Sequence, residues 1–235
     1  MQLFYTPSLT AETKEFEFSK DESQHIIKVL RMKEGDVVYT TNGQGYIFTG
    51  RILAAHPQKC RAAIEGHERR HHKHYHLHLA VAPTKVNSRF EWFLEKATEI
   101  GIDEITPLFC ERSERRVVKL NRLQKVIESA MKQSLRAYLP LLNPPMDIRE
   151  FIKKEHQGMK FIAHCEDVEK TDLKRRLGAD QDVTILIGPE GDFTHQEIKN
   201  AYGQGFHPIS LGEARLRTET AALMACATVG IINNR

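Results

Sequence analysis

Two glycine-containing stretches near the C-terminus combine residue types that could bind and position a small ligand. The first is Ile185-Leu-Ile-Gly-Pro-Glu-Gly-Asp-Phe-Thr-His-Gln-Glu197. It begins in the apolar run Val183–Ile187, which is typical of a buried strand and stops at Gly188. Thr194 and Glu197 follow at the spacing of a capping box, so a helix is predicted to begin there.

The second stretch, Ile209-Ser-Leu-Gly-Glu-Ala-Arg-Leu-Arg-Thr-Glu-Thr-Ala221, repeats this order of features. A short strand over Pro208–Leu211 ends at Gly212, a polar loop leads to Thr218, and a nearly all-apolar segment covers Ala221–Ile232. Two successive strand–loop–helix units place both loops at one edge of a sheet, where open α/β folds bind ligands. Glycine at such a place lets backbone N–H and C=O groups approach a ligand closely.

Neither loop is a standard phosphate cradle. Gly188-Pro-Glu-Gly191 lacks the Lys-Ser/Thr pair of a P-loop, and no G-x-G-x-x-G follows a strand. ATP hydrolysis and dinucleotide binding are therefore disfavoured. What remains is a ligand held by backbone groups against an apolar wall of Ile187, Leu211 and Leu216. The alternative is that both glycines only make tight turns.

The charged residues of the two loops each have two interpretations. Glu190 and Glu219 could act as a base, or could cap a helix N-terminus, where the helix dipole favours a carboxylate. Arg215 and Arg217 could bind a phosphate or stabilise an anionic transition state. The alternative for both arginines is a surface ion pair with Glu213 or Glu219.

From Leu77 onward strands and helices alternate, which predicts a mostly parallel sheet covered on both faces. The strands predicted before the glycine loops are 77–82, 105–109 and 160–165, and the helices are 88–100, 119–136, 147–156 and 171–177. Ser88 and Glu91 have capping-box spacing, and Gly101 ends that helix. The 119–136 helix carries one stripe of cations, at Arg122, Lys125, Lys132 and Arg136.

Residues 1–70 instead show short strands at close spacing, which predicts a small β-barrel. The strands are 3–5, 15–18, 37–41, 45–53 and 59–64, with an Asn42-Gly43 hairpin signal. One helix is predicted over 21–31, with His25, Lys28 and Arg31 on a face that could meet a partner or only solvent, and Ile26, Val29 and Leu30 toward the barrel.

Between the two parts lies His67-Glu-Arg-Arg-His-His-Lys-His-Tyr-His-Leu-His78. His74, His76 and His78 alternate with apolar or aromatic residues, and no carboxylate or cysteine partner stands beside them. This pattern favours a linker and an edge strand over a metal site. The domain boundary is placed here, giving domains 1–70 and 71–235.

The composition, with 40% apolar and 28% charged residues, is that of a globular protein. No apolar run is long enough to span a bilayer and the start lacks a signal peptide, so a cytoplasmic protein without a membrane role is expected. The four cysteines lie far apart with no C-x-x-C, so buried thiols are expected rather than disulfides or a zinc site. Net charge is only +3, but 112–136 holds eight Lys/Arg and two Glu.

At this point the motifs resemble the RsmE family, ribosomal small-subunit RNA uridine N3-methyltransferases of the knotted SPOUT superfamily. Ile187–Thr194 with Glu197, and Leu211–Ala221, resemble its two C-terminal signatures. Earlier motifs in the same order are His25-Ile-Ile-Lys-Val-Leu-Arg31 with Gly35-Asp36; Lys85, Glu91, Lys96–Gly101, Pro107 and Arg112-Ser113; and Gln133-Ser134, Arg136 and Leu139-Pro140. Two positions depart from the family pattern, since Asp192 and Leu135 stand where the family usually has glycine.

The resemblance implies an α/β fold with a deep trefoil knot in a SPOUT domain, a PUA-like N-terminal RNA-binding barrel, and a homodimer without a metal. It implies S-adenosylmethionine as cofactor and 16S ribosomal RNA, free or in the small subunit, as partner. The residues it assigns to the cofactor are Ile187, Gly188, Pro189, Glu190, Gly191, Ser210, Leu211, Gly212, Leu216 and Thr218.

For transfer to N3 of a uridine, Arg217 or Arg112 would stabilise the developing negative charge and Glu219 or a water would take the proton. RNA contacts are expected from His25, Arg31, Arg112, Arg122, Lys125, Lys132 and Arg136. Two alternatives stay open: a non-catalytic RNA-binding or ribosome-assembly factor of the same fold, and a SPOUT enzyme that modifies another RNA nucleotide.

Overall fold

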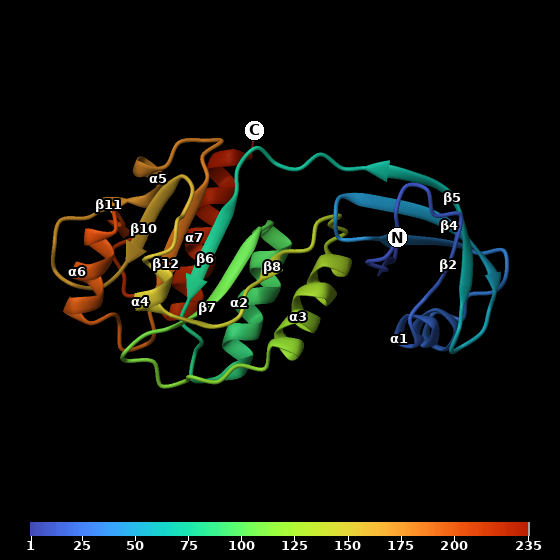
Figure 1. Cartoon of the computed structure of the whole chain (residues 1–235), viewed down its shortest axis with the longest axis horizontal. Helices are drawn as coiled ribbons and strands as arrows, with labels where there is room; N and C mark the ends of the chain where they lie inside the picture. Colours follow the sequence, from blue (N-terminus) through green and yellow to red (C-terminus); the bar gives the residue numbers. More distant parts are fainter. Residues whose placement is uncertain (235) are drawn as a thin grey trace. The chain divides into compact units, whose positions relative to one another are not determined.

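The computed structural model describes residues 1–234, which divide into two compact units (Figure 1). Unit 1 comprises Met1–His72 and Glu128–Leu139; unit 2 comprises Lys73–Ile127 and Pro140–Arg235. The segment Glu128–Leu139 thus packs with the N-terminal residues, although it is distant from them in sequence.

Unit 1 is built on a five-stranded sheet in the order β1-β3-β4-β5-β2. Its strands are β1 (Leu3–Tyr5), β2 (Glu15–Glu17), β3 (Val37–Thr41), β4 (Tyr46–Ala54) and β5 (Arg61–Arg69). The pair β1–β3 is parallel and the others are antiparallel. As predicted, β3 and β4 form a hairpin, because the side chain of Asn42 accepts hydrogen bonds from the backbone N–H groups of Gln44 and Tyr46.

The helix of unit 1 differs from the predicted 21–31 helix. A short α1 (Lys20–Gln24), capped by the side chain of Ser19, continues into a π-helical turn, η1 (His25–Val29). A π turn places more residues in each turn than an α-helix and so rotates the following side chains. Ile26 is buried as expected, but Val29 is 67% exposed and Leu30 is 38% exposed, so the predicted inward orientation of these two is wrong.

Unit 2 is built on an eight-stranded sheet whose pairs are all parallel, in the order β11-β13-β10-β12-β6-β7-β8, with β9 also paired to β7. Its strands are β6 (Leu77–Val81), β7 (Glu104–Phe109), β8 (Leu141–Leu142), β9 (Met146–Asp147), β10 (Met159–Ala163), β11 (Thr171–Asp172), β12 (Val183–Ile187) and β13 (His207–Ser210). All five residues of β12 are buried, since β10 and β6 flank that strand. The predicted α/β fold with a mostly parallel sheet is confirmed.

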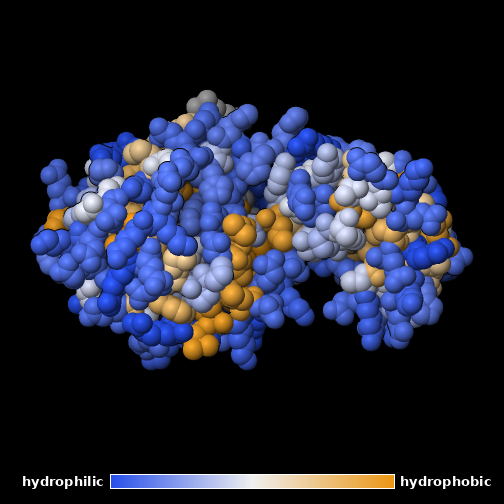
Figure 2. All heavy atoms as spheres, in the orientation of Figure 1, coloured by the Kyte–Doolittle hydropathy of each residue, from blue (hydrophilic) through white to orange (hydrophobic). Residues whose placement is uncertain are grey.

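The helices of unit 2 cover the sheet. They are α2 (Asn87–Ile100), the first part of α3 (Leu120–Gln133), α4 (Ile148–Phe151), α5 (Leu173–Arg176), α6 (His195–Gly203) and α7 (Thr218–Asn233). Helix α7 packs against α2, β6 and β12, and Cys226 of α7 lies against the backbone of Ala97 in α2. Ile148 of α4 and Ile198 of α6 share a separate apolar cluster with Leu186 of β12. Hydrophobic side chains on the visible face of unit 2 gather near β8, where Leu141 is 57% exposed (Figure 2).

Four helix predictions need correction. The 147–156 helix shortens to the single turn of α4, and residues 171–172 pair with β13 as strand β11 before the short α5. Helix α2 begins before Ser88, and its N-cap is Val86, whose apolar side chain makes no capping hydrogen bond. Glu91 pairs with Arg122. The division between the units falls within α3, so an amphipathic pattern over 119–136 did not reveal that the two ends of the helix belong to different units.

Two further predictions are wrong. The strand following the histidine tract is not an edge strand: β6 lies between β12 and β7, and all five of its residues are buried. Of the alternating histidines, His74 and His76 precede β6 and His78 is part of it. Among the four cysteines, Cys165 is exposed while the other three are buried.

Within residues 1–234 no helix combines the length and apolar character needed to cross a bilayer. The same residues contain no group of three or more His, Cys, Asp or Glu arranged to hold a metal ion.

Candidate functional site

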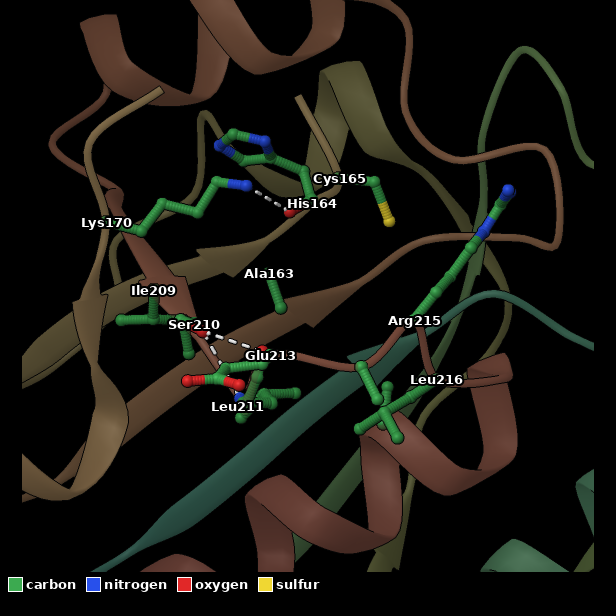
Figure 3. Close-up of a pocket in the computed structure, with 13 residues that line it drawn as sticks. Ala163, His164, Cys165, Lys170, Ile209, Ser210, Leu211, Glu213, Arg215 and Leu216 are labelled. Atoms are coloured by element: carbon green, nitrogen blue, oxygen red, sulfur yellow. Dashed lines mark hydrogen bonds between the residues drawn. The ribbon is translucent and has the colours of Figure 1, made fainter. Parts of the chain in front are cut away.

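Two adjoining cavities open at the carboxyl edge of the parallel sheet in unit 2. Their volumes are about 450 and 240 Å³. The larger lies between the end of β10 and the loop from β13 to α7, as Figure 3 shows. The smaller lies between the loop after β12 and the start of α7. Both are lined by Ala163, Cys165, Arg215, Leu216 and Ala221. The strand–loop–helix repeat in the sequence thus produces one composite site at the edge where parallel sheets bind ligands.

Gly212 lines the larger cavity and exposes its backbone to open space. Its φ of +131° lies in a region that side-chain-bearing residues rarely adopt, and a Cβ built on it meets no heavy atom within 4 Å. The hydroxyl of Ser210 donates to the carbonyl of Gly212 and accepts from its N–H, which fixes this turn. A side chain at residue 212 would strain the backbone and project into unfilled space beside the larger cavity.

Gly188 is confined for a different reason. A Cβ at this residue would approach the ring of Phe193 to 3.0 Å, so glycine lets the loop pass close to a buried aromatic side chain. The carbonyl of Gly188 accepts a hydrogen bond from the buried hydroxyl of Thr218, at 3.0 Å. That bond joins the loop after β12 to the first residue of α7.

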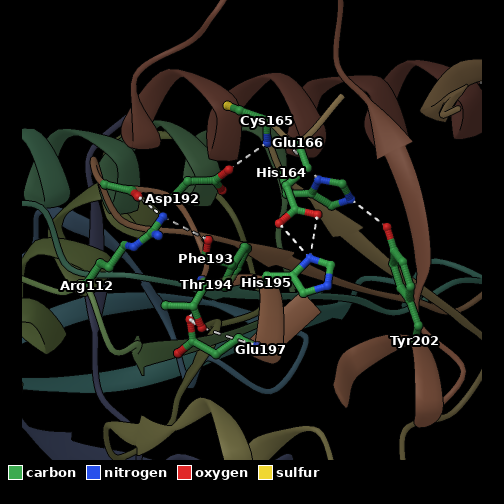
Figure 4. Close-up of polar contacts among 11 residues, drawn as sticks. Arg112, His164, Cys165, Glu166, Asp192, Phe193, Thr194, His195, Glu197 and Tyr202 are labelled. Atoms are coloured by element: carbon green, nitrogen blue, oxygen red, sulfur yellow. Dashed lines mark hydrogen bonds and ion pairs between the residues drawn. The ribbon is translucent and has the colours of Figure 1, made fainter. Parts of the chain in front are cut away.

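Other segments of the chain also hold the loop between β12 and α6, residues 188–194, which we call the glycine loop. The guanidinium of Arg112 donates to the carbonyls of Gly191 and Phe193, at 3.1 and 3.3 Å. The carboxylate of Glu190 accepts from the N–H of Lys85 at 3.0 Å. The predicted capping box of Thr194 and Glu197 at α6 is present (Figure 4). Glu197 also accepts a hydrogen bond from the N–H of Glu111. Segments that are distant in sequence thus fix the loop before any ligand binds.

Comparisons with known proteins agree with this architecture. Residues 71–230 match the family described as an RNA methyltransferase domain, and residues 18–65 match an RNA methyltransferase PUA domain. Ribosomal RNA small subunit methyltransferase E of Rickettsia conorii is 30% identical over 233 residues, covering 98% of this chain and 95% of the relative. The chain belongs to the RsmE family of RNA methyltransferases.

Solved structures resemble the whole chain. A probable rRNA-methyltransferase from Porphyromonas gingivalis is 39% identical with a TM-score of 0.90, and covers 99% of this chain and 98% of its own. A ribosomal RNA small subunit methyltransferase E from Neisseria gonorrhoeae, bound to S-adenosyl methionine, is 27% identical with a TM-score of 0.87 and the same coverage.

Most residues that the RsmE resemblance assigns to the cofactor line the two cavities. Ser210, Leu211, Gly212 and Leu216 line the larger; Ile187, Gly188, Pro189, Glu190, Leu216 and Thr218 line the smaller. Gly191 lines neither, because its α-carbon faces the side chain of Arg112. Their role in cofactor binding stays a prediction.

The three candidate catalytic residues of this family member lie in different settings. Arg217 lines the smaller cavity. Arg112 is engaged with loop carbonyls, which suits it to hold the loop rather than to meet a substrate. Glu219 lines neither cavity; it is 8% exposed, and its carboxylate lies 3.8 Å from Nε of Arg89.

The sequence interpretation missed the contribution of the chain that follows β10. His164, Cys165 and Lys170 line the larger cavity, together with Glu213 and Ala214. The predicted strand 160–165 could have revealed it, because neighbouring parallel strands end at the same edge. Burial, and secondarily the charge of Lys170, lowers the pKa of His164. That imidazole lies 2.8 Å from the hydroxyl of Tyr202.

Both departures from the family's glycines occur at positive φ. Asp192 has φ +61° and Leu135 has φ +56°. Glycine adopts this region without penalty, and aspartate is among the few other residues that tolerate it, whereas leucine is strained there. The physical reason for glycine at both family positions is therefore the backbone.

The candidate RNA-binding residues fall into both units. In unit 1, Lys132 pairs with Glu22 at 2.8 Å, Arg31 is exposed, and the ring of His25 packs edge-on against Phe4; Arg136 lies just beyond α3. In unit 2, Arg122 pairs with Glu91 at 2.6 Å. Lys125 follows one turn later on the same helix. The predicted stripe is thus partly engaged in ion pairs within each unit.

Proposed function

We propose that this protein transfers a methyl group from S-adenosyl-L-methionine to N3 of one uridine in 16S ribosomal RNA of the small subunit. The observation that carries the proposal is the pair of glycine loops, joined by Thr218 and Gly188, that line two adjoining cavities at the carboxyl edge of the sheet. Relatives that share nearly the full length are named ribosomal RNA small subunit methyltransferase E, and one of them holds the cofactor.

The cavity residues suit a nucleoside-bearing cofactor. Ile187, Leu211 and Leu216 supply apolar surface for a base, and the open space at Gly212 leaves backbone groups accessible. Glu190, Asp192, Arg215 and Arg217 surround the smaller cavity with both signs of charge, as a ligand that carries both signs requires. Bound S-adenosylmethionine supplies a methyl group already activated on a sulfonium, so the residues of this chain have only to orient the acceptor and control its charge.

The acceptor nitrogen of uridine carries a proton that must leave before or during attack. Arg217, at the smaller cavity, is placed to stabilise the uridine as it becomes anionic. Glu219, the other candidate, is buried beside Arg89, so a water is better placed than Glu219 to accept the proton. Since N3 lies on the Watson–Crick edge, the target uridine has to be unpaired or flipped out of its stack.

The two parts of the chain have separate roles in this proposal. Residues 1–70 form the RNA-binding domain and residues 71–235 the methyltransferase domain, with the trefoil knot of the SPOUT superfamily. The protein acts as a homodimer, because α7 leaves Met224 43% and Ile231 75% exposed on an apolar helix whose other side is packed.

The decisive experiment is transfer of label from methyl-labelled S-adenosylmethionine. Purified protein is incubated with small ribosomal subunits that lack the modification, in parallel with the free RNA, and the nucleosides are digested and separated. Label in 3-methyluridine supports the proposal. Label in another nucleoside means that the enzyme class is right and the target wrong, and binding of RNA without transfer favours an assembly factor.

A further inference from the structure

The segment between β10 and β11 forms a wall of both cavities. His164, Cys165 and Lys170 line the larger cavity, and Cys165 also lines the smaller. The segment contains no regular secondary structure between Ala163 and Thr171, so its position depends on contacts with its neighbours. We refer to residues 164–170 as the wall segment.

Three side-chain contacts join the wall segment to the part of the chain that begins at Asp192 (Figure 4). The carboxylate of Asp192 accepts a hydrogen bond from the N–H of Cys165, at 2.8 Å. The carboxylate of Glu166 lies 3.2 Å from Nδ1 of His195, and Nε2 of His164 lies 2.8 Å from the hydroxyl of Tyr202. All three partners belong to the glycine loop or to α6.

The contact made by Asp192 differs from the other two in the residue that it holds. It acts directly on Cys165, the one member of the wall segment among the residues that line both cavities. His195 is 83% exposed, so its pairing with Glu166 contributes little. Tyr202, in α6, contacts His164, which precedes Cys165 and lines only the larger of the two cavities.

The backbone of Asp192 is in the left-handed region, and its N–H donates to the carbonyl of Pro189 at 2.9 Å. Glycine, which the family usually carries at this position, would complete the same turn with less strain. Glycine would not supply the carboxylate that reaches Cys165. Aspartate at this position therefore retains the turn and adds a hydrogen bond that joins the glycine loop to the wall segment.

We propose that Asp192 is a positioning residue of the methyl-donor site: its carboxylate holds Cys165, and with it the wall segment, against the ligand. The identity of that ligand rests on the proposed function. The link itself is a property of the free protein. Without it the wall segment moves away from the glycine loop more often, and a ligand in the cavities dissociates faster.

The test compares Asp192→Gly and Asp192→Asn with the parent protein. Asp180→Gly is the matched control, because Asp180 is also an aspartate at positive φ, +59°, and lines neither cavity. Two quantities are measured for each: hydrogen exchange of the Cys165 amide in the ligand-free protein, and the affinity and dissociation rate of S-adenosylmethionine.

For Asp192→Gly we expect amide exchange at Cys165 and cofactor dissociation each to rise by about tenfold, the effect of losing one charge-assisted hydrogen bond. Asp192→Asn keeps an oxygen acceptor and should recover most of both. Asp180→Gly should change neither. Chemical denaturation of Asp192→Gly checks that the variant still folds cooperatively, so that both changes are measured in the native protein.

Unchanged exchange and unchanged dissociation in Asp192→Gly would overturn the proposal, and so would equal losses in Asp192→Gly and Asp192→Asn. If the parent protein itself does not bind S-adenosylmethionine, the proposed function fails. The exchange of the Cys165 amide would still decide whether Asp192 holds the wall segment.

Discussion

The hydroxyl of Thr218 donates a buried hydrogen bond of 3.0 Å to the carbonyl of Gly188. Gly188 follows the last residue of β12, and Thr218 is the first residue of α7, so one bond couples the two glycine loops. The bond holds the two loops together at the shared cavities, although Gly212 lies 24 positions after Gly188 in the sequence. Any loosening of this bond is expected to affect both sides of the site.

Replacing Thr218 by Val removes the donor and leaves the carbonyl of Gly188 without it in a buried place. We expect a loss of about 1–3 kcal/mol in the free energy of unfolding and weaker cofactor binding. Thr228→Val is the matched control, because Thr228 is on the same helix and its exposed hydroxyl donates only to the carbonyl of Met224. Urea denaturation and calorimetry measure the two effects; equal behaviour of the two variants would show that the link has no special role.

Gly212→Val should weaken cofactor binding by about 2 kcal/mol or more, roughly 30-fold, in a protein that still folds. Its φ of +131° is unfavourable for valine, and the added side chain would occupy space beside the larger cavity. Gly66→Val is a suitable control, since Gly66 also has open space at its Cβ but no positive φ. Calorimetric affinity equal to that of the parent would contradict the placement of the site.

How much the sequence could predict depended on the kind of signal. The strand patterns at Val37–Thr41 and Val183–Ile187 depend only on local polarity and turn residues, and the structure has both strands at those bounds. The inward orientation predicted for Val29 and Leu30 assumed an α-helical repeat, and a π turn changed it. Ile26 of this turn is buried in the core of unit 1, a tertiary contact that a local pattern does not contain.

The site shows the same limit. Glycines that end strands marked both loops, because a backbone requirement is visible in a single residue type. The wall segment and the link from Asp192 to Cys165 were not visible, because they depend on which strand lies next to which. β10 neighbours both β12 and β13, whereas β11, the next strand in the sequence, is at the edge.

Leu135→Gly should stabilise the protein by about 0.5–1 kcal/mol. Leu135 follows α3 at φ +56°, and the N–H of Arg136 closes the helix end onto the carbonyl of Met131. Glycine removes the strain of about 1–2 kcal/mol at such a position, and part of that gain is offset by the greater entropy of the unfolded chain. Denaturation of Leu135→Gly beside Leu141→Gly, an exposed leucine on a strand, measures the difference. A destabilised Leu135→Gly would mean that its side-chain packing outweighs the strain.

His78 makes the protein less stable in acid. Burial, followed by the charges of His156 and His76, lowers its pKa to about 3, and its Nε2 lies 2.8 Å from the hydroxyl of Thr106. In the unfolded chain the pKa is about 6.5, so the unfolded state binds the proton first as the pH falls. His78 therefore costs up to about 1.4 kcal/mol of stability per pH unit between pH 6.5 and 3.

His78→Gln should flatten the dependence of the free energy of unfolding on pH in this range, whatever the substitution does to stability at neutral pH. The exposed His74→Gln in the same tract is the control and should leave the slope unchanged. Urea denaturation between pH 7 and 4.5 measures both. A parallel profile for His78→Gln and the parent would show that His78 takes up a proton in the folded protein.

Arg217→Ala separates catalysis from cofactor binding. Arg217 lines the smaller cavity and directly precedes α7, whose first residue holds Gly188. Its charge matters most as the uridine loses its N3 proton, so its removal should lower kcat about 100-fold or more, equivalent to about 2.7 kcal/mol, while the affinity for S-adenosylmethionine changes by less than about threefold. Arg217→Lys should restore part of the rate by returning a positive charge, and a rise in pH should partly rescue Arg217→Ala, because more uridine is then already deprotonated.

Single-turnover methylation of unmodified small subunits gives the rate, and calorimetry gives the affinity. Losses of rate and affinity by the same factor would place Arg217 on the cofactor instead of the acceptor base.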